Sequence, residues 1–106
     1  MDSRSSAAYF VQVTVSSTAK TLTSVSAGFT AAQVAAASRL WVSVDTGALR
    51  LTWDSAQTVP TTTKGMLIAN KNYPLFELVG NTNITNLQMI RDGGVDAVVN
   101  LLIENQ

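Results

Sequence analysis

The sequence predicts an all-β protein: a single-domain β-sandwich or jelly roll with one short helical turn. Short segments of alternating apolar and polar residues recur along its 106 residues, and turn-forming residues such as Gly, Asn and Asp separate them. About seven or eight strands are expected from this spacing, which is typical of sandwiches and jelly rolls. Strands alternating with helices are not indicated, so an α/β fold is excluded.

The most regular segment runs from Arg39 to Asp54, and its alternate residues form an apolar face and a polar face. We expect it to fold back as a hairpin at Thr46–Gly47, where glycine supplies a positive φ. A longer loop from Asp45 to Ala48 keeps the same strand pairs. The apolar face then carries Leu40, Val42, Val44, Leu49, Leu51 and Trp53, and the polar face carries Trp41, Ser43, Asp45, Arg50, Thr52 and Asp54. A one-residue slip would scatter the apolar set over both faces, which indicates this register.

The chain before this segment is expected to contain an arm and two strands. Residues 1–8 are small and polar and predict a mobile arm, ahead of a folded domain over residues 9–106. Residues 9–15 alternate as a strand, and residues 21–25 indicate a shorter one.

The helical turn is expected directly after these strands. Thr30 and Gln33 fit a capping box, in which each side chain satisfies one backbone N–H at the start of a helix. The alanines that follow favour helix, and the segment ends at Ser38, so two turns at most fit.

The C-terminal half is expected to hold four strands, at residues 65–69, 75–79, 87–91 and 95–104. Ordered loops are expected at 55–64, where Pro60 interrupts a ladder, and at 81–86, which is rich in Asn and Thr. The last strand is apolar on both faces. It is expected either to lie centrally in its sheet under a second layer or to place one face in a subunit contact.

A second hairpin is expected between the last two strands. A two-residue loop at Gly93–Gly94 places Arg91 opposite Asp96 as a cross-strand ion pair. A three-residue loop would instead pair Met89 with Ala97. The shorter loop is preferred because two-residue loops are the commonest hairpin connections.

Composition limits the partners and the chemistry. Seven basic residues cancel seven acidic ones, so no net field attracts nucleic acid or a charged membrane. Charged residues make up 13% of the chain, well below the roughly 25% of ordinary soluble domains. We therefore expect part of the surface to be covered by other subunits, in a homodimer or homotrimer. No apolar run approaches the roughly 20 residues of a membrane helix, and the first residues do not resemble a signal peptide.

No catalytic, cofactor or metal site is predicted, and the protein is not expected to be an enzyme. His and Cys are absent, which removes the commonest general base and the thiolate metal ligand. Five carboxylates could in principle supply an acid–base pair or a Ca²⁺ site: Asp45, Asp54, Glu77, Asp92 and Asp96. A structural role is preferred, because Asp45 and Asp92 lie at expected turns and Asp54 ends a strand, and no Asp-rich loop of Ca²⁺-binding spacing occurs.

Trp41 is the main candidate for a binding residue. It lies on the polar face of the expected hairpin, beside Ser43 and Arg50. Three explanations stay open: burial under a loop or second sheet, a protein interface, or stacking on a sugar. Trp41, Ser43 and Arg50 are the predicted interface residues.

Three segments together resemble a group of small proteins encoded among the virion genes of tailed bacteriophages: residues 41–54, 58–65 and 83–94, within a likeness over 39–103. Members of that group are similar to the cement, or decoration, proteins that sit on capsids as small β-sandwich or jelly-roll oligomers. The resemblance implies a structural protein, made in the host cytoplasm, that binds the major capsid protein at the virion surface. The alternative is a sugar-binding or tail or head-fibre module.

Overall fold

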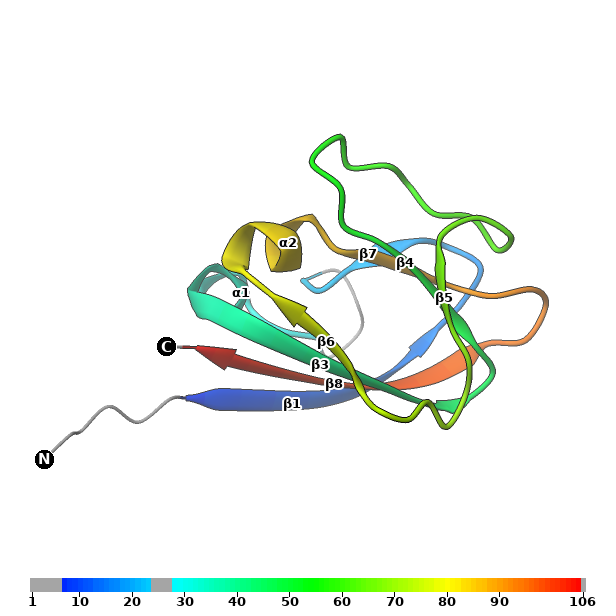
Figure 1. Cartoon of the computed structure of the whole chain (residues 1–106), viewed down its shortest axis with the longest axis horizontal. Coiled ribbons are helices and arrows are strands. Elements are labelled where there is room, and N and C mark those ends of the chain that lie inside the picture. The colour runs from blue at the N-terminus through cyan, green and yellow to red at the C-terminus, as the bar shows by residue number, and fades with distance from the viewer. Residues whose placement is uncertain (1–6, 24–27, 106) are drawn as a thin grey trace, which may run out of the picture.

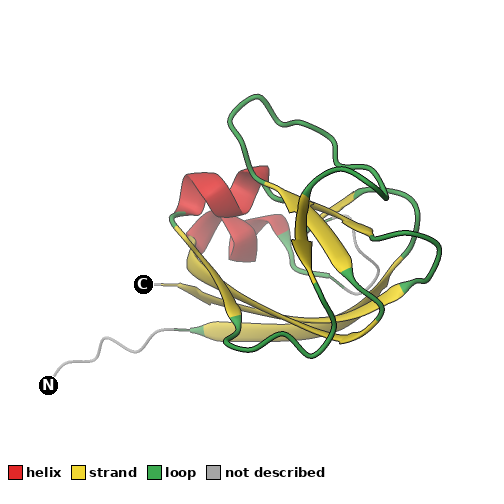
Figure 2. Ribbon diagram, turned by 45° about the vertical axis from the view of Figure 1, so that its right-hand side comes forward, coloured by secondary structure: helices red, strands yellow, loops and turns green. Residues whose placement is uncertain are grey.

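Two four-stranded antiparallel sheets form a sandwich in the computed structural model, which describes residues 7–23 and 28–105 (Figure 1). Sheet A contains, in spatial order, β1 (Ala8–Val15), β8 (Ala97–Asn105), β3 (Ala37–Thr46) and β6 (Phe76–Val79). Sheet B contains β2 (Lys20–Thr21), β7 (Gln88–Arg91), β4 (Leu49–Thr52) and β5 (Met66–Ile68). Two short helices, α1 (Ala31–Ala36) and α2 (Asn81–Asn86), lie at one end (Figure 2). Neither described helix is long and apolar enough to cross a membrane.

The strands pair as if one long hairpin had been wrapped into a sandwich. β1 pairs with β8, β2 with β7, β3 with β6 and β4 with β5, all antiparallel. Consecutive strands therefore lie in opposite sheets, except for β4 and β5. This strand order is that of an eight-stranded jelly roll, so the predicted fold class is confirmed.

The core lies between the sheets, and it contains the apolar face expected for residues 39–54. Five members of that face are completely buried: Leu40, Val42, Val44, Leu49 and Leu51. Trp53 is half-buried and packs against the ring of Phe76, with the two ring centroids 5.4 Å apart. Burial of these side chains is the main favourable contribution to folding.

The hairpin expected within residues 39–54 does not form. β3 lies in sheet A and β4 in sheet B, so Leu40 is opposite Leu78 and Ile103 rather than Trp53. Gly47, with φ +73°, turns the chain from one sheet to the other. Alternation identified the buried face correctly, but both sheets of a sandwich point into the same core. The pattern therefore does not distinguish two paired strands from two facing strands.

The second expected hairpin is wrong for the same reason. β7 pairs with β4 and β2, whereas β8 pairs with β1 and β3. Met89 accordingly lies opposite Leu51, which also rules out the three-residue loop. The ion pair expected between Arg91 and Asp96 does form, across the connection between the sheets.

Strand β8 is central, as expected, with β1 and β3 on either side. Sheet B covers only one of its faces, where Ala97, Val99, Leu101 and Ile103 are buried. The other face carries the half-buried side chains of Val98 and Leu102. No described residue forms a second layer over that outer face.

The predicted capping box is confirmed. The Thr30 hydroxyl accepts a hydrogen bond from the Gln33 amide at 3.1 Å, and the Gln33 side chain accepts one from the Thr30 amide at 3.0 Å. Strand β1 begins at Ala8, and Ala7 is already paired, since its carbonyl accepts from the Asn105 amide at 2.9 Å. Residues 1–6 of the expected arm, and residues 24–25 of the expected short strand, lie outside the described residues.

Residues 81–86 were expected to form a loop and instead form helix α2. Ile84 anchors this helix in the core with 1% of its surface exposed. Asn81 donates through Nδ2 to the carbonyls of three residues at the end of α1: Val34, Ala35 and Ala37. These partners are distant in sequence, so the local Asn- and Thr-rich composition did not indicate them.

Candidate functional site

The outer face of sheet A presents an ordered row of side chains across its four strands. Phe10 on β1 lies opposite Leu102 on β8, and Leu102 lies opposite Trp41 on β3. Glu77 on β6 completes this row beside Trp41. Residues directly opposite one another in antiparallel strands share a face, so three large apolar side chains are neighbours on the outside of the sandwich.

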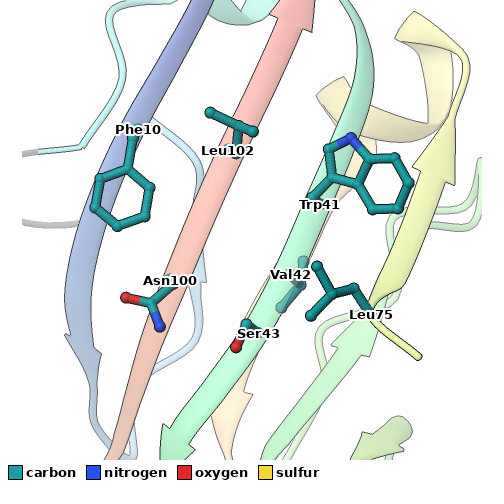
Figure 3. Close-up of a pocket in the computed structure, with 7 residues that line it drawn as sticks. All are labelled: Phe10, Trp41, Val42, Ser43, Leu75, Asn100 and Leu102. Atoms are coloured by element: carbon teal, nitrogen blue, oxygen red, sulfur yellow. The ribbon is translucent and has the colours of Figure 1, made fainter. Parts of the chain in front are cut away.

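An open groove of about 370 Å³ follows this row. Phe10, Leu102, Trp41 and Leu75 form its apolar sides, and Ser43 and Asn100 supply its polar atoms (Figure 3). The groove walls are solvent-accessible, since Phe10 is 60% and Leu75 47% exposed. Large apolar side chains gathered on an exposed sheet face are typical of an interaction surface rather than of an ordinary solvated one.

Polar contacts orient the Trp41 side chain in this row. Trp41 donates through Nε1 to the Glu104 carboxylate at 3.3 Å. The guanidinium of Arg39 lies 5.9 Å from the centroid of the Trp41 ring, and its Nε pairs with Glu77 at 2.9 Å. The indole is therefore oriented before any partner arrives, which lowers the entropic cost of binding.

The neighbouring row is polar. Gln12 donates through Nε2 to Asn100 at 2.9 Å and to Asp45 at 3.3 Å. Ser43 lies opposite Asn100. An apolar strip bordered by polar side chains has the arrangement of a protein interface, with a dry centre and a wet rim.

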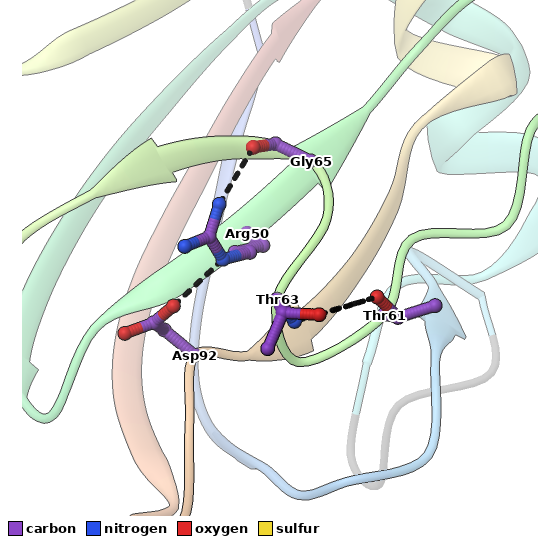
Figure 4. A network of polar contacts seen from close by, with 5 residues as sticks. All are labelled: Arg50, Thr61, Thr63, Gly65 and Asp92. Atoms are coloured by element: carbon purple, nitrogen blue, oxygen red, sulfur yellow. Dashed lines mark hydrogen bonds and ion pairs between the residues drawn. The ribbon is translucent and has the colours of Figure 1, made fainter.

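Arg50 does not belong to this surface. It lies on β4 in sheet B, where its Nε pairs with Asp92 at 2.6 Å and its Nη1 donates to the Gly65 carbonyl at 3.1 Å (Figure 4). The structure thus brings together two of the three predicted interface residues, Trp41 and Ser43, and separates the third. Arg50 was grouped with them because the hairpin of residues 39–54 was expected to form one sheet.

Phe10, Leu75 and Leu102 are the groove residues that the sequence did not identify. Leu102 had a signal, because the last strand is apolar on both of its faces. Phe10 had none, because it alternates with the apolar residues of its strand and shares a side with Gln12 and Thr14. Their convergence depends on the pairing of β1 with β8 and β8 with β3, which no local pattern indicates.

The loop between β4 and β5 covers part of the outer face of sheet B, whereas Leu67 on the same face of β5 is 54% exposed. Pro60 in this loop is buried, and Ile90, on the outward side of β7, is 4% exposed. The loop is tied down by hydrogen bonds, among them Thr52 Oγ1 to the Thr58 carbonyl at 2.6 Å and the Gly93 amide to the Thr62 carbonyl at 2.9 Å. The outer face of sheet A carries the open apolar groove, and the outer face of sheet B is partly covered by this loop.

The acidic residues do not converge. Each of the five candidate carboxylates has its own partner: Asp45 with Gln12, Asp54 with Thr58, Glu77 with Arg39, Asp92 with Arg50, and Asp96 with Arg91. The hydrogen bond from the Thr58 hydroxyl is the main cause that lowers the pKa of Asp54 below its usual value. Residues 7–23 and 28–105 contain no group of three or more side chains suited to hold a metal ion.

No protein-family model, curated protein or solved structure matches the chain. The fold and the surface define it as a jelly-roll protein with an open, apolar groove on the outer face of sheet A and a partly covered outer face on sheet B. The function is therefore inferred from the groove on the outer face of sheet A.

Proposed function

We propose that the chain is a structural virion protein of a tailed bacteriophage, a capsid cement or decoration protein that binds the major capsid shell through the outer face of sheet A. The observation that carries this proposal is the apolar groove between Phe10, Leu102, Trp41 and Leu75. Phe10 and Leu75 are exposed, Trp41 and Leu102 are half-buried, and polar groups border them, which suits a protein partner.

Two further observations support the choice of partner. Residues 41–54, 58–65 and 83–94 resemble small virion proteins, as described above. Jelly rolls also occur among viral capsid domains, although the same fold serves lectins and enzymes and so does not name a function. A low charged fraction of 13% suits a protein that works with much of its surface covered.

Binding to purified capsids that lack the protein tests the site. Leu75→Asp places a charge in the groove, and Leu67→Asp places the same charge on β5 of sheet B. The two leucines are 47% and 54% exposed, so they are matched in residue type and exposure. We expect Leu75→Asp to weaken co-sedimentation with capsids about tenfold or more, and Leu67→Asp to leave it unchanged.

Equal binding by both variants would contradict the assignment of the groove, as would selective loss with Leu67→Asp. The copy number in purified virions tests the location separately. Hundreds of copies per particle support a cement protein, whereas a handful would place the protein in the tail or head fibre.

The second candidate function is sugar binding in the same groove. Trp41 lies beside Ser43 and Asn100, and an indole with neighbouring hydroxyl and amide groups suits a sugar ring. Five of the seven lining residues are apolar, however: Phe10, Trp41, Val42, Leu75 and Leu102. Because a sugar needs several polar contacts, the shell partner is preferred. If the protein binds to a glycan array and Trp41→Ala abolishes that binding, sugar binding becomes the preferred function.

A further inference from the structure

Strand β1 is a long, unprotected sheet edge. It pairs with β8 on one side, and no described residue pairs with its other side. β1 is 8 residues long, whereas the other outer strands, β6, β5 and β2, have 4, 3 and 2 residues. Proteins protect sheet edges with short strands, charges, proline or bulges. The residues of β1 include no charged residue and no proline, and its register with β8 runs without a bulge.

The open backbone groups of this edge can be identified. The Asn105 amide donates to the Ala7 carbonyl, so Ala7 directs its backbone carbonyl toward β8. Because residues of an antiparallel strand alternate between facing the partner and facing away, the even-numbered residues point outward: Ala8, Phe10, Gln12 and Thr14. Their N–H and C=O groups line the free edge, and their side chains lie on the outer face of sheet A.

We infer that β1 pairs antiparallel with β1 of a second copy, in a two-fold dimer whose sheet A continues from one copy into the other. A two-fold axis at residue 11 or 12 matches even-numbered residues with even-numbered residues, so the open donors of each copy meet the open acceptors of its partner. The strand is uncharged, so self-pairing creates no like-charge contact between the two strands.

Two consequences distinguish this arrangement. An isologous pairing of one edge closes at two copies, so it selects the dimer over the trimer. The two-fold axis is perpendicular to the sheet, so both grooves lie on the same side of the dimer, with Phe10 of each copy near the junction. The inference does not depend on the shell-binding proposal, although two grooves on one side would strengthen shell binding through multivalency.

Gln12→Pro and Gln12→Ala form a matched pair of test variants. The Gln12 N–H points to the free edge, so proline removes a bond to the second copy and leaves the ladder with β8 intact. Alanine keeps that N–H and removes the same side-chain contacts with Asn100 and Asp45. By light scattering or sedimentation, we expect the native chain and Gln12→Ala to have twice the mass of the 11.3-kDa chain. Gln12→Pro should be monomeric, with an unchanged circular dichroism spectrum.

Hydrogen exchange on the native chain gives a second readout, which holds even if Gln12→Pro fails to fold. We expect slow exchange of the Phe10, Gln12 and Thr14 amides in concentrated solution and fast exchange on dilution, while Val11 and Val13 stay protected throughout. A monomer at about 100 micromolar, where weak specific interfaces are populated, would overturn the inference. So would a trimer, a dimer that survives Gln12→Pro, or fast exchange of the three amides at high concentration. No capsid is used, so a failure here is distinct from a failure of the shell proposal.

Discussion

Gly47 lies against the backbone of Asp96, so closely that a Cβ atom at residue 47 would be 2.7 Å from the Asp96 carbonyl oxygen. The two residues belong to the two connections that were expected to be hairpin loops. Both connections instead cross between the sheets, at residues 46–49 and 91–97, and they pack on each other. This contact ties the crossing from β3 to β4 to the crossing from β7 to β8.

Gly47→Ala is expected to destabilise the protein by about 1–3 kcal/mol, because the added methyl meets backbone and φ is +73°. Gly93→Ala is the matched control, since Gly93 has φ +65° and no atom within 4 Å of an added Cβ. Urea unfolding measures the loss of stability in both variants. The difference between the two losses gives the cost of the contact with Asp96, because both variants carry the cost of a positive φ. Equal losses would show that the packing of the two connections contributes nothing.

Asn81→Ala is expected to lower the free energy of unfolding by about 1–2 kcal/mol, because three carbonyls at the end of α1 lose the hydrogen bond from the Asn81 side chain. Asn83→Ala removes a single hydrogen bond, to the Val79 carbonyl at 3.0 Å, and should cost under about 1 kcal/mol. Thermal melting measures the difference. An Asn81 variant no less stable than the Asn83 variant would contradict this role.

Arg50→Ala is expected to cost about 1–3 kcal/mol of stability, since Arg50 is 21% exposed and holds both Asp92 and the Gly65 carbonyl. Arg39→Ala should cost under about 1 kcal/mol, because Arg39 is 47% exposed and its pair with Glu77 is screened by water. Chemical denaturation of the two variants provides the comparison. The opposite ranking would show that Arg50 is not a structural residue of sheet B.

Asp54 is expected to titrate below the usual range of an Asp carboxyl, because the Thr58 hydroxyl donates to it at 2.6 Å. A pKa that is lower in the folded than in the unfolded state stabilises the fold above the unfolded value. That contribution is lost as the pH falls through the folded value. Carbon-detected NMR titration should show the pKa of Asp54 rising toward its usual value in Thr58→Val and not in Thr61→Val. An unchanged pKa in Thr58→Val would rule out this hydrogen bond as the cause.

The sequence by itself determined which side chains are buried and how α1 begins. Alternation placed Leu40, Val42 and Leu51 on the buried face, because a pleated strand turns every second side chain to the same side. The capping box of Thr30 was equally visible, since its partners are three residues apart. The Arg91–Asp96 ion pair was expected for a wrong reason: it forms between the two ends of the connection from β7 to β8, not across a hairpin.

Only the tertiary structure decided which strands pair, and with that which residues make up the groove. Phe10, Leu102 and Trp41 are neighbours because β8 lies between β1 and β3. Arg50 was predicted beside Trp41 and lies instead in the other sheet. The physical reason is that both sheets bury their apolar faces in one shared core, so the same alternating pattern satisfies a strand in either sheet. Pairing is a long-range choice, made by the combined packing of all eight strands.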